Sequence, residues 1–293
     1  MGVLYGLASA LSWGSADFAG GFASRRISET LAILGGQTVG LLIAAAFVLV
    51  SGEPRPAPEA LAWGALAGAS GTIGLLGFYR VLAEGQMSLA APLVAVIGAG
   101  LPALVGIVLG ESLGALQLLG VGCGLLAIAI VSWTGGAPLA DPAAVARGEA
   151  HPAPAVTRAW PLILLAGLGF AGFYLAISQA TASGGGAIWW PLLAARAATV
   201  AVGLALVLRA RPPMTGLRPA WPLMLVIGGG DFGGNAFFVL AGQQGPLAVA
   251  VILSSLYPVT TVMLATWLLH ERLRRWQVLG VVLALLGVVL IAT

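Results

Sequence analysis

The sequence has few charged residues and no lysine. Charged side chains make up 8% of the 293 residues and hydrophobic ones 59%, and the mean hydropathy is +1.02. A soluble domain carries about 25% charged residues, so this chain has too little charge to cover a surface in water. We expect a protein that crosses a lipid bilayer many times.

The absence of lysine excludes two kinds of chemistry. A phosphate-binding P-loop uses a lysine to reach the nucleotide phosphates, and a Schiff base needs a lysine amine. All 13 basic residues are arginines. An ATPase motor of the P-loop type is therefore excluded, no cofactor is expected, and the small net charge gives no indication of nucleic-acid binding.

Metal ligands are also scarce. Cys123 is the single cysteine and lies in an apolar run, while His151 and His270 stand apart from each other in loops or at a helix end. One cysteine allows no intramolecular disulfide, and we expect Cys123 to be a small buried residue in a helix. No metal site is predicted.

Apolar runs between charged or proline- and glycine-rich breaks predict ten transmembrane helices. A span needs about 20 apolar residues to cross a hydrocarbon core of about 30 Å. The expected spans are residues 2–22, 30–50, 61–83, 88–109, 114–133, 159–181, 187–208, 220–242, 246–268 and 275–292. The fold class is therefore an all-α polytopic membrane protein.

The chain contains an internal duplication. Residues 111–130 and 271–290 share eight of 20 positions, among them Glu111 with Glu271 and Gln117 with Gln277. Polar and glycine matches in register are not expected by chance in an apolar background. We divide the chain into a first repeat of five helices (1–133), an exposed linker (134–158) and a second repeat of five helices (159–293).

Five helices per repeat predict that the two copies cross the membrane in opposite senses. Such inverted repeats are typical of secondary transporters, whose substrate site lies near the bilayer midplane between the halves. We therefore expect two inverted five-helix repeats around a central cavity.

The arginines predict the orientation. The connections after the first, fifth, seventh and ninth spans carry ten arginines, and the opposite face carries only Arg55. By the positive-inside rule the arginine-rich face is cytoplasmic, so both termini are expected outside the cytoplasm. The expected location is a prokaryotic plasma (inner) membrane.

A motif near the end of the chain resembles a known family. Pro258-Val259-Thr260 precedes Glu271-Arg272-Leu273, Gln277, Gly280 and Gly287-Val288, and Trp13-Gly14 lies in the first span. This pattern is similar to the EamA-like branch of the drug/metabolite transporter superfamily. The resemblance covers the whole chain and implies a ten-helix exporter or exchanger of small metabolites, often amino acids, that consumes no ATP. Members usually have both termini in the cytoplasm, whereas the arginines here predict the reverse.

Three charged residues lie inside expected spans: Asp17, Arg196 and Asp231. A charge at the centre of a span costs about 2.5 to 3.5 kcal/mol on insertion scales, so each is a candidate for substrate or ion binding.

Arg196 and Asp231 lie about 20 Å from the arginine-rich face in consecutive spans, at about 1.5 Å per residue, so an ion pair is possible. That pair either fixes the packing of its spans or handles substrate or protons. In the repeat Gln37 matches Arg196 and Ile73 matches Asp231, so the site is expected to be asymmetric.

Asp17 lies about 12 Å from the same face. We hypothesise that it binds and releases a proton during transport, because burial favours the neutral form of a carboxylate. Alternatively, its carboxylate reaches the interface or pairs with Arg25 or Arg26.

Three further residues are candidates to line the cavity. Asn235 lies one turn from Asp231 and could bind either Asp231 or substrate, and Trp13 and Tyr257 stand beside small residues. Elsewhere, structural roles are expected. Glu111 and Glu271 are expected to cap the helices that follow them, and Arg80 is expected to pair with Glu84 across one helical turn.

Together these features predict a secondary active transporter that works by alternating access and exports or exchanges a small metabolite, an amino acid or related compound being favoured. Protons are a candidate coupling ion. The alternative is a proton-coupled multidrug exporter of lipophilic cations, favoured by Asp17 and Asp231 but disfavoured by Arg196. An intramembrane enzyme would need a cluster of His, Asp or Ser at one depth, which the sequence lacks, and a non-transporting scaffold would have no use for buried charges. Substrate identity, direction of transport and oligomeric state stay open.

Overall fold

A computed structural model of the chain describes residues 1–23, 27–83, 87–132, 160–213, 217–268 and 275–292. The linker predicted at 134–158, both histidines, Glu84 and Glu271 lie outside the described residues. The side chains of Arg80 and Arg218 are likewise not described.

Within those residues the structure has eleven helices and no strand, as the hydropathy predicts. Those of the first half are α1 (Gly2–Ala23), α2 (Glu29–Ser51), α3 (Pro58–Ala83), α4 (Met87–Val108) and α5 (Ala115–Ser132). Those of the second half are α7 (Trp160–Ser183), α8 (Trp189–Ala210), α9 (Leu217–Gln243), α10 (Leu247–Ser254), α11 (Tyr257–Leu268) and α12 (Arg275–Ala292).

The helices match the ten expected spans except that the ninth is broken. The span expected at 246–268 consists of α10 and α11, with Ser255 and Leu256 between them. Pro258 lies in the first turn of α11, where its missing N–H and fixed φ are tolerated. A turn at Ser255 and Leu256, just before Pro258, therefore interrupts the ninth span.

Seven helical segments of the described chain are long and apolar enough to cross a membrane, and α4 and α5 contain shorter apolar stretches. α1 is not among them. It is rich in glycine, alanine and serine, and it lies inside the bundle against α9, α10 and α11.

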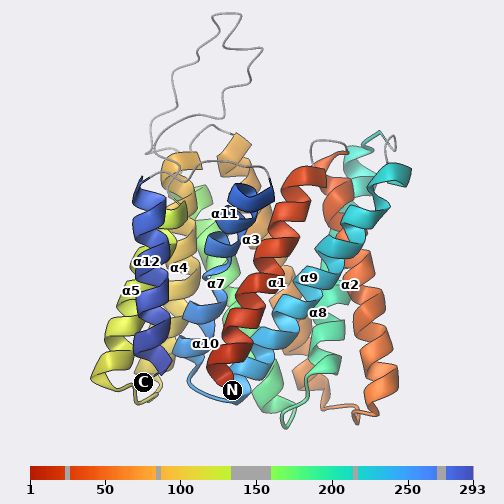
Figure 1. Cartoon of the computed structure of the whole chain (residues 1–293). Helices are drawn as coiled ribbons and strands as arrows, with labels where there is room; N and C mark the ends of the chain where they lie inside the picture. The colour runs from red at the N-terminus through yellow and green to blue at the C-terminus, as the bar shows by residue number, and fades with distance from the viewer. Residues whose placement is uncertain (24–26, 84–86, 133–159, 214–216, 269–274, 293) are drawn as a thin grey trace, which may run out of the picture.

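Both chain ends lie at the same end of the bundle (Figure 1). We name this end the termini face, where α1 begins at Gly2 and α12 ends at Ala292. The opposite end is the linker face, where α5 ends at Ser132 and α7 begins at Trp160. Arg55 lies on the termini face, and Arg209 and Arg275 lie at helix ends on the linker face.

The two halves of the chain interleave. The most extensive helix contacts join α3 to α7, α1 to α9 and α5 to α12, each pairing one helix from either half. Glycine makes these contacts close: a Cβ on Gly74 would meet the backbone of Phe170, and one on Gly120 would meet the backbone of Gly287. Small residues at such positions let helix backbones approach in a membrane.

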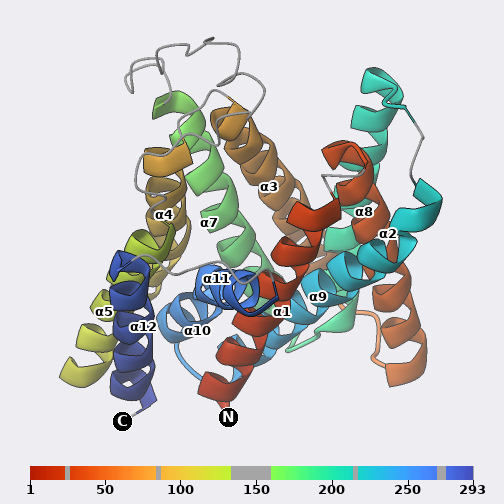
Figure 2. The ribbon, with the colours of Figure 1, turned by 45° about the horizontal axis from the view of Figure 1, so that its top comes forward.

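Figure 2 shows that the packing differs between the two faces. The linker-face ends of α3 and α7 diverge from those of α1 and α2, with α11 between the two groups. α10, on the termini side of α11, is buried from Ala248 to Ser254. α10 and Phe238 therefore lie in the main hydrophobic core.

Candidate functional site

Aromatic rings from four helices meet at Trp13. Its ring centroid lies 6.4 Å from that of Phe173, 5.9 Å from Tyr174, 6.2 Å from Phe238 and 6.3 Å from Tyr257. Edge-to-face and stacked pairs at these distances attract each other beyond the area that they bury. We name these five residues the aromatic cluster. It includes Trp13 and Tyr257, two of the residues that the sequence assigns to the cavity.

Asn235 is bound into this cluster. Its Oδ1 accepts a hydrogen bond of 3.0 Å from the Trp13 indole N–H, and the residue is 5% exposed. The sequence suggested Asp231 or substrate as the partner of Asn235, and the structure adds Trp13 as a partner that was not predicted. Asn235 therefore orients the indole ring.

The break between α10 and α11 adjoins the cluster. The hydroxyls of Tyr174 and Ser255 are hydrogen bonded at 3.0 Å, and the buried hydroxyl of Ser254 has no partner among the described residues. Broken helices at membrane depth are tolerated where they are buried in protein or line a cavity. This break brings backbone and hydroxyl groups to the middle of the bundle.

Arg196 and Asp231 form the ion pair that their depth in the sequence allows. The guanidinium Nη1 donates to Asp231 and also to Gln37 of α2. Gln37 donates in turn to Asp231 at 2.6 Å. Side-chain exposure is 5% for Arg196 and 26% for Asp231, so the arginine is the buried partner.

Gln37 contacts both members of the Arg196–Asp231 pair, but it was not proposed as a site residue from the sequence. The sequence feature that could have identified it is its match to Arg196 in the duplication. Because α2 and α8 pack on each other, the two matched positions come into contact. Here the polar residue that aligns with Arg196 in the other repeat is also its hydrogen-bond partner.

Asp17 stands one turn beyond Trp13, on the linker side of the aromatic cluster. Its side chain is exposed, and it lies four residues after Trp13, so the two side chains lie on one face of α1. Because α1 lies inside the bundle against α9, α10 and α11, the carboxylate is accessible beside the aromatic cluster. Asp17 makes no ion pair with a described residue, and its expected alternative partners Arg25 and Arg26 lie outside the described residues.

Among the described residues, the carboxylates of Asp17 and Asp231 differ in their partners. Asp231 is neutralised by Arg196, whereas Asp17 has no basic partner among the residues that the structure describes. A carboxylate beside exposed aromatic faces attracts cations, because ring faces carry partial negative charge.

Two other carboxylates hold helix N-termini on the termini face. Glu53 accepts hydrogen bonds from the N–H groups of Ile188, Trp189 and Trp190 at 2.7 to 3.1 Å, at the start of α8. Glu111 accepts from Leu247 and Ala248 at 2.6 and 3.1 Å, at the start of α10. Each ties the first half of the chain to the second.

These contacts correct the prediction for Glu111. The carboxylate does meet the positive end of a helix dipole, but the helix is α10 and not α5, which follows it in sequence. Glu53 was not identified from the sequence, because nothing near it predicts a partner 135 residues away.

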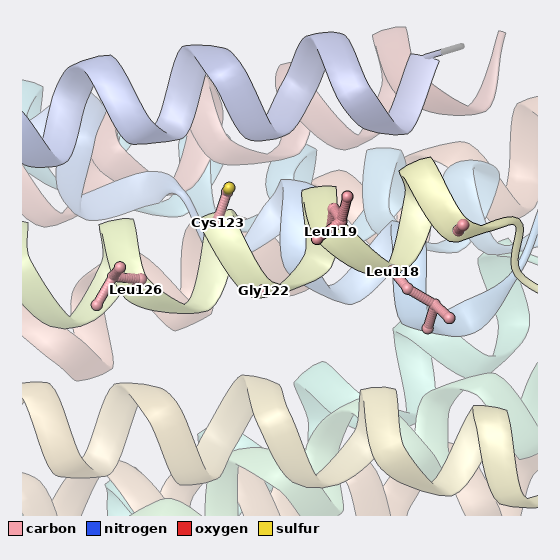
Figure 3. Close-up of a pocket in the computed structure, with 6 residues that line it drawn as sticks. Leu118, Leu119, Gly122, Cys123 and Leu126 are labelled. Carbon is pink, nitrogen blue, oxygen red and sulfur yellow. The ribbon is translucent and has the colours of Figure 1, made fainter.

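Two hollows in the described part of the chain bear on the candidate site. A shallow groove runs along α5 and is lined by Ala115, Leu118, Leu119, Gly122, Cys123 and Leu126 (Figure 3). Its apolar lining suits contact with lipid and offers no group to bind a polar solute. Cys123 lies at this groove and is half-buried, so the prediction that it is a buried residue is only partly right.

The second hollow lies between α7 and α9 near the termini face. Its lining includes Ser178, Thr181, Phe238 and Gln243. Neither hollow offers a metal site, and no group of three metal-ligating side chains occurs in the described part of the chain.

Known proteins resemble this chain in sequence and in fold. The model of the EamA-like transporter family matches residues 1–133 and 157–293. A solved structure titled "Crystal structure of protein" superposes with a TM-score of 0.76, covering 99% of this chain and 95% of that chain at 18% identity. At that identity the likeness concerns the fold alone. No curated protein matches the chain.

Proposed function

Since the chain belongs to the EamA-like transporter family, we propose that it is a secondary active transporter that exports or exchanges a small metabolite by alternating access. The membership confirms the resemblance drawn from the motif near Glu271. It supports a multi-pass membrane protein that binds a small-molecule substrate.

We also propose that the transporter consists of two inverted repeats, residues 1–133 and 159–293, joined by the linker 134–158. The helix contacts support this arrangement. If helices are matched in chain order, α1 against α9 corresponds to α7 against α3, and α2 against α9 corresponds to α8 against α3. α2 with α8 and α5 with α12 are pairs of matched helices in contact. Such a pattern is expected of two copies related by a two-fold axis in the membrane plane.

The observation that carries the proposed substrate class is the accessible carboxylate of Asp17 beside the aromatic cluster. An ammonium group suits this site, because both the carboxylate and the ring faces attract it. Amino acids and related amines carry such a group, and they are the substrates that we favour. Nη1 of Arg196 is bound to Asp231 and Gln37 and the side chain is only 5% exposed, so we assign Arg196 a positioning role for Asp231 and not the binding of a substrate carboxylate.

The same observation supports a second candidate, a proton-coupled exporter of lipophilic cations. The objection from the sequence was the positive charge of Arg196. Its pairing with Asp231 removes that objection, and the aromatic cluster suits a flat or lipophilic cation.

In both cases we propose Asp17 as the residue that binds a proton when substrate leaves. Asp231 suits this role less, because it is already bound by Arg196 and Gln37.

Transport by the purified protein in proteoliposomes tests the proposal. Radiolabelled amino acids, simple amines and tetraphenylphosphonium are offered with and without an imposed pH gradient. We expect accumulation of an amine-bearing solute that collapses when the gradient is dissipated. Asp17→Asn is expected to abolish this dependence, whereas Glu59→Gln, which changes an exposed carboxylate of α3, leaves it intact.

Full pH-dependent transport by Asp17→Asn contradicts the proton role of Asp17. If tetraphenylphosphonium accumulates and no amino acid does, the result favours the exporter of lipophilic cations over the amino-acid transporter. Transport of anionic solutes alone contradicts the substrate class in both forms.

A further inference from the structure

The hollow between α7 and α9 lies directly behind the aromatic cluster. It has a volume of about 230 Å³, somewhat below the range of about 300 to 1,000 Å³ for pockets that hold drug-sized ligands. Phe238 belongs to both the hollow and the cluster. The two sites therefore share a wall.

Residues of both sites form continuous lines on two helices. On α7, Tyr174 is followed by Ser178 and Thr181, at steps of four and three residues. Such steps place side chains on one face of a helix. Both helices run from the linker face to the termini face (Figure 1), so Ser178 and Thr181 lie on the termini side of Tyr174.

α9 repeats the pattern. Asp231, Asn235, Phe238 and Gly242 follow each other at steps of four, three and four residues. The line therefore begins at the charged residue beside Asp17, passes through the aromatic cluster and ends in the hollow.

Three aromatic rings stand between Asp17 and the hollow. Trp13, Tyr174 and Phe238 all contact each other, with centroids 5.9, 6.2 and 4.8 Å apart. Asp17 lies on one side of these rings, and Ser178 and Gln243 lie on the other. A solute passing along the line must displace at least one ring.

We propose that this hollow is a second binding site for the transported solute, an uncharged vestibule from which the solute is released on the termini face. The proposal rests on the transport function proposed above. Two hydroxyls and an amide, from Ser178, Thr181 and Gln243, line it, and none of its described lining residues is charged. A small polar amine finds hydrogen-bond partners there but no counter-ion, so it is held more weakly than beside Asp17.

The vestibule is partly open at the termini face, where Gly186, Gly242 and Gln243 of its lining are exposed. Gln243 donates to the carbonyl of Gly186 at 2.8 Å across this opening. Leu247, another lining residue, is held by Glu111 through its N–H. Glu111 is the contact from the first half of the chain, and breaking it frees the start of α10 and is expected to widen the vestibule at the termini face.

Cysteine accessibility in sealed membrane vesicles of both orientations tests this proposal without knowledge of the substrate. In a Cys123→Ala background, Ser178→Cys and Thr181→Cys are each exposed to a membrane-impermeant methanethiosulfonate, and modification is followed by mass spectrometry. The control is Leu285→Cys on α12, a leucine 63% exposed on the face of its helix opposite Gly280, Ala284 and Gly287.

We expect both vestibule cysteines to react from the termini face only, at least about tenfold faster than Leu285→Cys, because a thiol must ionise in water to react. Adding Glu111→Gln is expected to raise their rates several-fold, whereas adding Glu59→Gln leaves them unchanged. Modification of Ser178→Cys is expected to block transport of the solute identified in proteoliposomes.

Two results overturn the vestibule: rates no faster than Leu285→Cys with and without Glu111→Gln, or reaction from the linker face alone. If the protein transports a solute while both cysteines stay unreactive, the vestibule is wrong and the transport function stands. If both cysteines react as expected but no solute is transported, the water-accessible vestibule stands and the transport function fails.

Discussion

Arg196 is buried with only part of its hydrogen-bonding capacity used. Nη1 binds Gln37 and Asp231, while Nε and Nη2 have no partner among the described residues. An unpaired buried donor costs stability, so the ion pair with Asp231 is the contact that makes this arginine tolerable inside a bundle. Removing one partner of such a pair is more harmful than removing both.

We predict that Arg196→Met destabilises the protein by about 3 to 5 kcal/mol, because it leaves the Asp231 carboxylate without its counter-ion. The double variant Arg196→Met with Asp231→Leu is expected to recover most of that loss. Thermal unfolding in one detergent, with wild type and both single variants, measures the difference. Equal losses in the single and the double variant contradict a net coupling between the two charges.

At the scale of whole helices, contacts between the halves depend on glycine. A Cβ on Gly68 of α3 would meet the backbone carbonyl of Ala195 in α8, and one on Gly64 would meet the carbonyl of Pro191 at 2.5 Å. Backbone atoms cannot move aside as a flexible side chain does. Gly122 of α5 offers the contrast, because a Cβ there meets nothing within 4 Å.

We therefore predict opposite effects for two glycine-to-alanine changes. Gly68→Ala is expected to destabilise the protein by about 1 to 3 kcal/mol through overpacking against α8. Gly122→Ala is expected to stabilise it by about 0.5 to 1 kcal/mol, since glycine within a helix is entropically costly. The unfolding temperatures of the two variants test both predictions. Equal destabilisation by Gly122→Ala and Gly68→Ala contradicts the close contact between α3 and α8.

Helices also contact each other through their ends. The sequence correctly predicts that Glu111 meets a helix N-terminus, but it assigns the wrong helix. Four N–H groups at each helix start lack partners within the helix, and any acceptor nearby in space can bind them. The order of the residues does not tell which acceptor that is.

For the whole molecule, the placement of charge predicts how the bundle sits in the membrane. Both termini lie on the face that carries Arg55 (Figure 1), and Arg209, Arg211 and Arg275 lie at helix ends on the other. The positive-inside rule puts the linker face in the cytoplasm. Combined with the proposed release from the vestibule on the termini face, this predicted orientation leads us to propose export as the direction of transport.

We predict that a cysteine added at the carboxyl terminus, in a Cys123→Ala background, reacts with an impermeant thiol reagent in intact cells. A cysteine at Arg209 is expected to be protected until the cells are opened. Protection of the carboxyl-terminal cysteine and labelling at position 209 contradict the orientation and reverse the inferred direction of transport.

The sequence by itself determined the all-helical fold, the bounds of nearly all spans and the charged residues within them. These features are local, because hydropathy over about 20 residues decides whether a segment enters a bilayer and a charge within it is visible directly. It also gave the pairing of Arg196 with Asp231, since two residues at one depth in consecutive spans are in reach of each other. The repeat boundaries and the roles of Asp17, Arg196 and Asp231 remain predictions.

Only the tertiary structure decided which distant groups meet. It showed Asn235 bound to Trp13, Gln37 beside Arg196, Glu53 and Glu111 at the starts of α8 and α10, and the break between α10 and α11. Each depends on helix rotation and on contacts between segments more than 100 residues apart, or on the packing around a proline. Hydropathy and periodicity say which face of a helix is apolar, but the neighbour on that face is set by the packing of the whole bundle.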